Sequence, residues 1–473
     1  MGSREGLMEI VLGQRGRKDT QSVVLTALVI SLVASGAASW LLSKSKAKRD
    51  EYGNVLDPVG GNRLKNAIGM IMAFIARFRE RQSTSKATLQ QLEAFHKPEA
   101  HDFFNESYYF SGCEKNSKDR LISRISRRGA GGEKSYVFML LDIDGVGPLS
   151  LEEDNVPVSE EAKASGLPSA LGVNYECIEP MQRWRVTYSG KMRRGCPTPD
   201  QAKNLKTDDL VQVELDLIYE RQTPVFYYIR DDCPETLAKN LSQEPWGLQF
   251  LKVCLKRNKN HGHYEDFGSL HGKISVDQGP SREFDFATFR DHSWDIRRWQ
   301  TMDSLLILLI ALEEPLRLFG HDYWFLDMTL VSMPGNESGV ARYSTGYMLP
   351  RQDLDAKAPV LCLTHGTSID DIPWKSMPDG TRQPMPVTDV LMYVRPEPTR
   401  SSEDSASVPV RIKMSGDVRR LMYYPDNNQF QCFEDCLDFQ ITNLVSKQTT
   451  KGYGTRQSGF RHGDFDPSLG GCG

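Results

Sequence analysis

The sequence predicts a mostly β protein whose strands form sandwiches or barrels, preceded by one N-terminal transmembrane helix. Beyond about residue 100, many short segments alternate apolar and polar residues, which is the period-two pattern of half-buried strands. Asp-Gly, Ser-Gly and Pro-Gly pairs separate these segments and mark turns. Near the N-terminus, one long stretch lacks charged residues altogether. Regularly spaced short strands are typical of sandwiches and barrels, and the uncharged stretch has the length of a membrane span.

Composition places the chain among ordinary globular proteins. It has 473 residues, of which 39% are hydrophobic and 25% charged. Its 58 basic and 62 acidic residues leave a net charge of −4, so no positive field indicates a nucleic-acid partner. The nine cysteines are odd in number, irregularly spaced and form no zinc-like set, which favours thiols in a reducing compartment.

The uncharged stretch runs from Thr20 to Ser43. We expect residues 1–21 to form an N-terminal tail and residues 22–43 a transmembrane helix, because this segment is long enough to cross a bilayer. A cleaved signal peptide is the alternative, since the sequence ASGAAS offers small residues for cleavage. The apolar core of a signal peptide, however, would be only about 7–15 residues long.

Residues 62–82 predict an amphipathic helix with basic residues at both ends. Its apolar positions recur at helical spacing and are Leu64, Ile68, Ile71, Ile75 and Phe78. One interpretation is a helix packed on the folded domain. The other is a helix lying in the membrane interface beside the anchor, with its basic ends on anionic lipid.

Basic residues flank the uncharged stretch almost equally, so they indicate the orientation of the span only weakly. Together with the cations of residues 62–82 they favour a cytosolic body. We therefore expect a single-pass membrane protein of the endomembrane system, such as the endoplasmic reticulum. Residues 22–43 would contact the lipid membrane, and residues 62–82 would be a second contact.

Strand alternation is clearest in residues 183–190, 209–221 and 408–416. Helical patterns are few after residue 82, and TLQQLEAFH (88–96) is one of them. The apolar run at 305–320 is too short for a second span and predicts either a buried strand or a helix covering a barrel mouth. DIDGVG (142–147) resembles the start of a calcium loop but lacks the required glutamate, which favours a hairpin turn.

The segment FRDHSWDIRRW (289–299) combines many charges with two tryptophans. As a strand, it places Arg290, His292 and Trp294 on one face and Asp291 and Ser293 on the other. Neither face is cleanly apolar. A small barrel that holds a ligand needs such a mixed face, with aromatic walls and a few fixed polar groups. The alternative is a buried Arg–Asp–His network that only fixes the end of a barrel.

Two adjoining segments resemble a known family. HYEDFGSLHGKISVDQG (263–279) followed by FRDHSWDIRRW is similar to the paired motif of the hydroxyneurosporene synthase (carotenoid hydratase) and AttH-like lipocalin-like family, closest to its uncharacterised RDHSWG members. NESYYFSG (105–112) and YSTGYMLP (343–350) agree in order, and the resemblance spans about residues 100–460. Asp295 stands where the family has glycine, and Arg298 where it has aspartate.

The resemblance implies two tandem lipocalin-like antiparallel β-barrel domains. They would occupy residues 100–260 and 261–460, followed by a disordered tail at 461–473. Members of that family bind or transform hydrophobic molecules such as isoprenoids, by hydration, cyclisation or isomerisation. They use no redox cofactor, so we expect no cofactor here.

The site residues that this resemblance carries over form two groups. The candidate catalytic residues are Asp291, His292 and Glu265, and the candidate ligand-binding residues are Arg290, Trp294, Tyr264, Arg297 and Trp299. In an enzyme, Asp291 or Glu265 would supply a proton and Trp294 would face a developing carbocation, while His292 or Arg290 would orient the acid. The alternatives are a non-catalytic lipid-binding or transfer module, and a structural scaffold with a packed barrel.

A metal site is a further possibility on the same strand. His261, His263 and Glu265 share one face, with His271 nearby, and two histidines and a carboxylate can hold zinc or iron. Histidine pairs on a strand surface are commoner without a metal, and the family resemblance implies none. We therefore expect no metal.

Overall fold

The computed structural model describes the chain from residue 63 to residue 461, with gaps. The described residues are 63–117, 119–196, 210–243, 261–277, 279–297, 302–334, 340–369, 372, 374–376, 382–384, 389–396, 406–423 and 430–461. The expected N-terminal tail, the expected transmembrane helix at 22–43 and nearly all of the expected C-terminal tail lie outside them. Within the described residues, no helix combines the length and the apolar character needed to cross a membrane.

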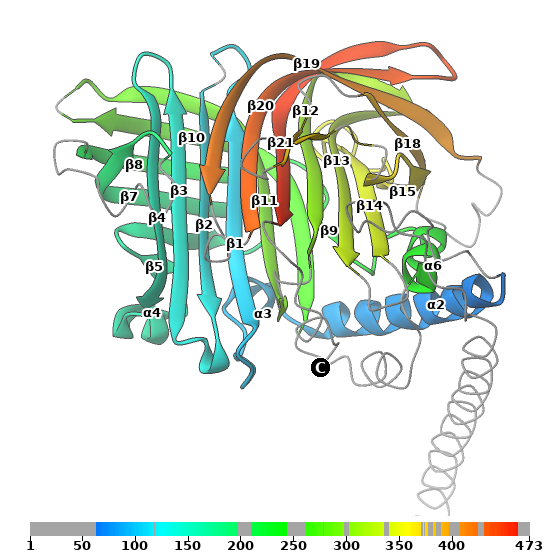
Figure 1. Ribbon diagram of the computed structural model, residues 1–473, viewed down its shortest axis with the longest axis horizontal. Helices are drawn as coiled ribbons and strands as arrows, with labels where there is room; N and C mark the ends of the chain where they lie inside the picture. Colours follow the sequence, from blue (N-terminus) through cyan, green and yellow to red (C-terminus); the bar gives the residue numbers. More distant parts are fainter. Residues whose placement is uncertain are drawn as a thin grey trace, which may run out of the picture.

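The first unit is an 11-stranded sheet in which β9 (Phe226–Tyr227) pairs beside the main path. The strands run in the order β4-β3-β2-β1-β11-β10-β8-β7-β6-β5, and β4 also pairs with β7, so the sheet curls back on itself. Their bounds are β1 Phe104–Cys113, β2 Arg120–Arg128, β3 Lys134–Ile143, β4 Gly147–Pro157, β5 Ser169–Ala170, β6 Val173–Glu179, β7 Arg183–Arg194, β8 Leu210–Arg221, β10 Gly262–Val276 and β11 Arg282–Ile296. Figure 1 shows this sheet on the left of the molecule.

The second unit is a closed antiparallel barrel. Its order β12-β13-β14-β15-β18-β19-β20-β21 follows the chain, as in the up-and-down barrels of lipocalins. The strands are β12 Ser304–Leu318, β13 His321–Pro334, β14 Val340–Pro350, β15 Leu361–Gly366, β18 Asp389–Pro396, β19 Val408–Tyr423, β20 Phe430–Asn443 and β21 Thr449–Arg461. A small pair, β16 (Trp374–Ser376) and β17 (Arg382–Pro384), stands apart from it. The predicted mostly β class is confirmed.

The boundary between the two units differs from the expected one at residue 261. β10 pairs with β8 and β11 pairs with β1, so both strands belong to the first sheet, and the barrel begins at β12. The apolar run at 305–320 is therefore the first strand of the barrel. Sequence order alone could not show this, because the pairing of β1 with β11 joins segments far apart in the chain.

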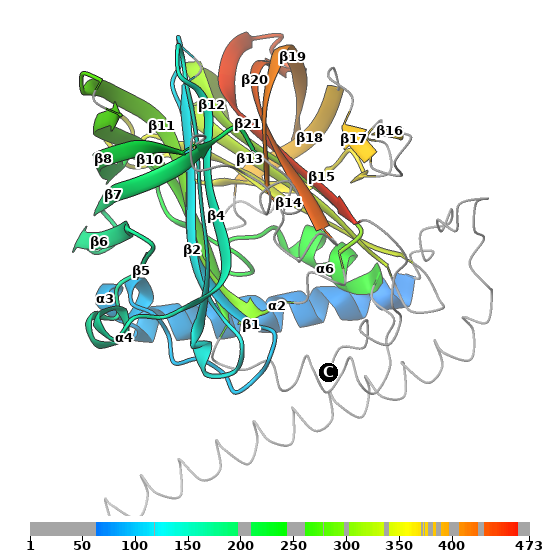
Figure 2. The same cartoon turned by 60° about the vertical axis from the view of Figure 1, so that its left-hand side comes forward.

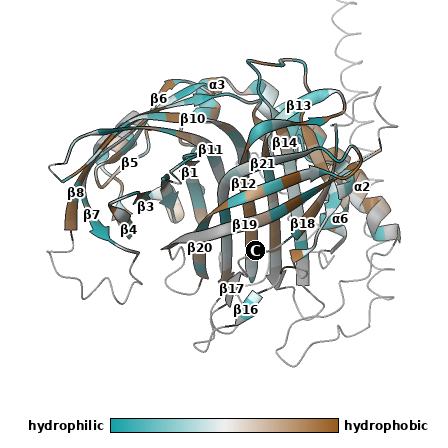
Figure 3. Ribbon diagram, turned by 90° about the horizontal axis from the view of Figure 1, so that it is seen from above, coloured by the Kyte–Doolittle hydropathy of each residue, from teal (hydrophilic) through white to brown (hydrophobic). Residues whose placement is uncertain are grey.

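Alternation along the strands builds the cores. In β8 the residues Val211, Val213, Leu215, Leu217 and Tyr219 are buried, while their neighbours are at least partly exposed, as the pattern at 209–221 predicts. Figure 3 shows hydrophobic and hydrophilic residues following one another along the strands. The predicted turn at 142–147 joins β3 to β4, and Gly145 there has a φ of 79°, which glycine adopts without strain.

An apolar cluster lies between the two units. It joins residues of the first sheet, such as Tyr109 and Phe267, to barrel residues such as Phe325 and Tyr347. The rings of Phe267 and Phe325 stack with their centroids 4.9 Å apart. The two sheets therefore share one buried interface.

In the described part of the chain, four α-helices accompany the strands: α2 (Arg63–Lys86), α3 (Leu89–Glu93), α4 (Glu160–Ser165) and α6 (Pro234–Gln243). Figures 1 and 2 show α2 crossing beneath the strands, with α6 beside it. A Cβ atom on Gly69 would lie 2.7 Å from the carbonyl oxygen of Ala238, so the two helices touch. The predicted helix at 62–82 is confirmed, and one of its faces packs on the body.

The opposite face of α2 is exposed. Ile71, Phe74 and Phe78 are 44%, 57% and 62% exposed, while Ile68 and Ala73 are buried. The exposed residues are three and four positions apart and so form one apolar stripe. The stripe predicted from the sequence is thus divided between a packed and an exposed face.

Candidate functional site

The predicted site residues lie on two opposite faces of the sheet around β11. Across the ladders, His292 stands opposite Tyr108 of β1 and Tyr264 of β10. Asp291 stands opposite Tyr109 and Glu265. Because successive side chains point to opposite faces of a strand, His292 is separated from Asp291 and Glu265. The expected catalytic group of three is corrected to two separate clusters.

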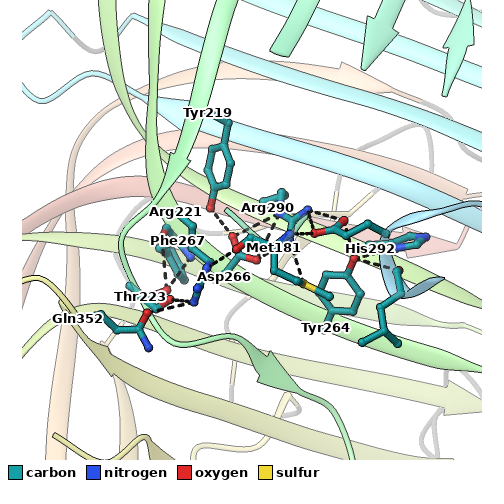
Figure 4. Close-up of polar contacts among 12 residues, drawn as sticks. Met181, Tyr219, Arg221, Thr223, Tyr264, Asp266, Phe267, Arg290, His292 and Gln352 are labelled. Atoms are coloured by element: carbon teal, nitrogen blue, oxygen red, sulfur yellow. Dashed lines mark hydrogen bonds and ion pairs between the residues drawn. The ribbon is translucent and has the colours of Figure 1, made fainter. Parts of the chain in front are cut away.

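On the interior face, Arg290 forms a buried network. Its Nη1 donates to both carboxylate oxygens of Glu93, at 3.0 and 2.9 Å, and its Nη2 donates to Asp266 at 2.8 Å. Tyr219 also donates to Asp266, as Figure 4 shows. Arg290 and Asp266 are at most 1% exposed. This network corresponds to the structural alternative, since it ties α3 to the sheet without reaching solvent.

Beside this network, two histidines converge on Glu106. His96 Nδ1 lies 2.8 Å and His292 Nε2 lies 3.1 Å from the same Glu106 oxygen, Oε1. Burial alone would raise the pKa of Glu106, but the two histidines hold it below its ordinary value. On its other side, His292 Nδ1 lies 2.9 Å from the Tyr264 hydroxyl, which donates to Glu93 at 2.8 Å. A continuous polar chain therefore runs from Glu93 to His96.

On the opposite face, His263 is held by two carboxylates. Its Nε2 contacts Asp291 and lies 3.1 Å from Glu265. Burial alone would lower the pKa of His263, but the charges of Asp291 and Glu265 raise it to about 9. His263 is therefore an imidazolium at neutral pH, and its charge lowers the pKa of Asp291 against the effect of burial. The proton expected on Asp291 thus lies on His263.

A pocket of about 350 Å³ opens where β10 and β11 meet the helices. Its apolar wall includes Ala87, Leu92, Phe95, Tyr227 and Trp294. Its polar wall includes Glu80, His96, His261 and His263. Between the two sheets, a second cavity has only about 10 Å³, which is about the room for one water. The sequence predicts a ligand cavity inside a barrel, but of these two cavities the larger lies at the end of the first sheet.

Trp294, which forms part of the apolar wall of this pocket, is buried with an indole N–H that is unsatisfied within the described part of the chain. The side chain is only 6% exposed, and its Nε1 has no hydrogen-bond partner among the described residues. The indole stacks on His96, with the ring centroids 3.8 Å apart. Gly262 lies directly beneath it, because a Cβ atom there would come within 2.3 Å of the indole ring. Gly262 therefore makes the position of Trp294 possible.

The remaining residues predicted to bind the ligand are not found among the described residues that line the pocket. Tyr264 is fully buried in the interior chain and does not line the pocket. Arg297 follows the end of β11, where its amide donates to the carbonyl of Phe103. Trp299 lies outside the described residues. Of the proposed ligand-binding residues, Trp294 lines the pocket.

Sequence reasoning missed Glu93, His96 and Glu106. Glu93 and His96 lie in or just after α3, and Glu106 lies on β1. The sequence predicts only a helix at 88–96 and a family resemblance at 105–112 for the segments that contain them. Their importance depends on the pairing of β1 with β11, which no local pattern reveals.

The fold and site define a two-unit antiparallel β protein with a mixed aromatic and histidine pocket at the end of its first sheet. Residues 90–335, more than half of the chain, match the family described as Domain of unknown function (DUF7064), and the protein belongs to that family. No curated protein matches the chain.

Solved structures that are similar to this chain include an AttH-like protein and a hydratase. The AttH-like protein NE1406 from Nitrosomonas europaea is 11% identical, with 80% of this chain and 97% of that chain covered and a TM-score of 0.45. Kievitone hydratase from Nectria haematococca is 9% identical, with coverage of 77% and 97% and a TM-score of 0.41.

Proposed function

We propose that the pocket beside Trp294 binds a hydrophobic, isoprenoid or lipid-like molecule that carries a hydrogen-bond acceptor. The observation that carries this proposal is the buried indole N–H of Trp294, which lacks a partner among the described residues at the wall of the pocket. A buried donor without a partner costs about 1–3 kcal/mol. A ligand hydroxyl or carbonyl at that place removes this cost, while the apolar wall receives the rest of the molecule.

As an enzyme, the protein would be a cofactor-independent hydratase, cyclase or isomerase in which His263 is the general acid. The imidazolium lines the pocket and is charged at neutral pH. It can therefore protonate an alkene or a leaving hydroxyl of the ligand, while Asp291 and Glu265 stabilise its charge. Trp294, on the apolar wall of the same pocket, would face the positive charge that develops on carbon. The resemblance of residues 263–299 to the hydroxyneurosporene synthase (carotenoid hydratase) and AttH-like family, which is closest to its uncharacterised members, is consistent with this class of chemistry.

The second candidate is a lipid-binding or transfer module, and the exposed apolar stripe on α2 favours it. Glu80, Ser83 and Thr84 of the same helix line the pocket, so a helix lying on a bilayer would bring the pocket close to the membrane. The anchor at 22–43 would hold the protein at an endomembrane surface with its body in the cytosol. A ligand would then pass from the bilayer into the pocket.

Ligand binding is tested by a matched pair of tryptophan variants. Trp294→Phe keeps most of the wall but removes the N–H, and we expect the full-length protein to lose most of its co-purifying hydrophobic molecule. Trp184→Phe is the control, because its indole N–H is also buried without a partner among the described residues, yet it does not line the pocket. Mass spectrometry of organic extracts measures both. Equal ligand content in the two variants would contradict the proposal.

Enzyme and carrier are separated by proton transfer. The extracted molecule is incubated in deuterated water with the wild-type protein and with His263→Gln. An enzyme incorporates deuterium on a ligand carbon or changes the ligand mass, and the variant loses this activity while still binding. A carrier shows no incorporation with either protein.

A further inference from the structure

A second site, which adjoins the pocket through His96, lies in the trio of His96, Glu106 and His292. Its side chains come from three places: the segment after α3, strand β1 and strand β11. One ring nitrogen of each histidine and one oxygen of Glu106 all lie within 4.8 Å of one another. Glu106 and His292 are fully buried, while the side chain of His96 is 20% exposed.

We propose that His96, Glu106 and His292 bind a divalent transition-metal ion of the zinc class. Two imidazoles and one carboxylate are the protein ligands of a common type of zinc site. Ligands about 2.0–2.1 Å from a tetrahedral ion lie about 3.3 Å from each other. The two ring nitrogens lie 2.8 and 3.1 Å from Glu106 Oε1, so small movements would open the trio around an ion.

The protons around Tyr264 support a cation at this place. The Tyr264 hydroxyl has one proton but lies 2.8 Å from Glu93 Oε2, 2.9 Å from His292 Nδ1 and 3.2 Å from the Leu92 carbonyl oxygen. If the proton goes to the carboxylate of Glu93, His292 Nδ1 must donate to the hydroxyl oxygen. In a neutral imidazole, Nε2 then has a lone pair that faces Glu106. Either a second proton or a cation must satisfy these two acceptors.

The surroundings of the trio match those of known metal ligands. A histidine that binds a metal almost always gives its other N–H to an oxygen that orients the ring. His292 Nδ1 lies 2.9 Å from the Tyr264 hydroxyl, which donates to Glu93, so the tautomer protonated at Nδ1 meets this condition. The backbone amide of His96 also donates to both oxygens of Glu106, at 2.9 and 3.0 Å, which fixes the carboxylate.

The other histidine–carboxylate cluster is a weaker candidate. Glu265 accepts hydrogen bonds from Tyr228 and Tyr347, and Asp291 accepts one from Ser293. His263 balances both carboxylates. This set offers only one nitrogen, against two in the trio. A cation of the zinc class favours the trio with two imidazoles.

The test uses the untagged full-length protein, dialysed against a chelator and then titrated with ZnCl₂ in a calorimeter. Elemental analysis after gel filtration should give roughly one zinc ion per chain, and MgCl₂ should not bind, because Mg²⁺ prefers oxygen ligands. Cobalt substitution should produce the visible absorption of a tetrahedral site. No zinc retained by the wild-type protein would overturn the proposal and leave a proton between His292 and Glu106.

Two matched variants locate the ion. His96→Gln should lose zinc, whereas His261→Gln should retain it, because both histidines line the pocket but only His96 belongs to the trio. Circular dichroism confirms that each variant is folded. Zinc retained by His96→Gln, or lost equally from both variants, would overturn the assignment. Glu106→Gln should weaken zinc binding and remove the cobalt absorption even if it also lowers stability.

Discussion

The positive charge of Arg290 is divided between two carboxylates that reach it from different parts of the chain. Glu93 comes with α3, and Asp266 stands opposite Arg290 on β10. All three side chains are at least 97% buried, with exposures of 3% or less. Such a group tolerates the loss of a member poorly, because the remaining charges stay in a medium that solvates them weakly.

Asp266→Asn should lower the free energy of unfolding by about 3–5 kcal/mol. Asp216→Asn is the control, because Asp216 also makes a bidentate pair, with Arg185, but both side chains are about half exposed. Water screens that pair, so its loss should matter much less. Denaturant unfolding measures both variants. A similar loss in each would mean that the Arg290 network does not stabilise the fold.

The ion pair of His263 with Asp291 and Glu265 makes stability depend on pH. Because the pKa of His263 is raised from 6.5 to about 9 in the folded protein, its contribution is complete below pH 6.5 and is lost as the pH rises through 9. That difference corresponds to about 3 kcal/mol. The gap in unfolding free energy between the wild-type protein and His263→Gln should therefore shrink from pH 6.5 to pH 10 by about this amount.

The same pH series in an Asp291→Asn background serves as the control. Removing one of the two carboxylates should reduce the pH dependence of the His263→Gln effect, since Asp291 is in contact with His263. A gap that does not change with pH would show that His263 is not held as an imidazolium.

Among the elements, β11 shows how far sequence reasoning reaches. The strand and the two faces predicted within residues 289–299 are found in β11 for residues 290–294. Its neighbours do not follow, because the pairing with β1 is set by the closure of the whole sheet. For this reason the sequence predicts that Arg290, His292 and Trp294 share one face of the strand. It does not predict their partners Glu93, His96 and Glu106.

For the helix α2, the sequence predicts the element but not what its apolar side packs against. Its periodicity predicts an amphipathic helix and leaves open whether the apolar side packs on protein or on lipid. In the structure, the apolar residues of α2 fall into two groups. Ile68 and Ala73 are buried, while Ile71, Phe74 and Phe78 are exposed. Arg79, Arg81 and Lys86 are exposed on the same helix, so the stripe has the cations that favour an anionic bilayer.

Replacement of Ile71, Phe74 and Phe78 by serine should release an anchor-deleted chain (residues 62–473) from vesicles that contain phosphatidylserine. The stripe supplies apolar area in the interface, so binding should fall several-fold even at low salt. Leu354→Ser combined with Val445→Ser is the control, because these residues are 61% and 67% exposed but do not lie on α2. Co-sedimentation measures binding. Circular dichroism first checks that the truncated chain is folded. A second comparison uses the same substitutions in the full-length protein, at a salt concentration that extracts peripheral proteins from membranes. Equal binding of all chains would exclude α2 as a membrane contact.

At the scale of the whole molecule, the two units have different roles. The barrel interior is filled by its own apolar cluster, and a separate cluster joins it to the first sheet. The pocket and both histidine clusters lie around β1, β10 and β11 of the first sheet. The barrel adds Tyr347, which donates to Glu265 at 2.5 Å and so reaches the site from the other unit. We infer that the barrel mainly supports the first sheet, which holds the pocket and both histidine clusters.

Native mass spectrometry of the full-length protein released from detergent micelles tests the central claim most directly, with Gly262→Ala as the variant. A methyl group at position 262 would overlap the indole of Trp294, so the wall of the pocket must shift. We predict one bound small hydrophobic molecule on the wild-type chain and an empty, folded Gly262→Ala chain with an unchanged far-ultraviolet spectrum. A wild-type chain that carries no such molecule, or a variant that retains it fully, would contradict the assignment of this pocket as the ligand site.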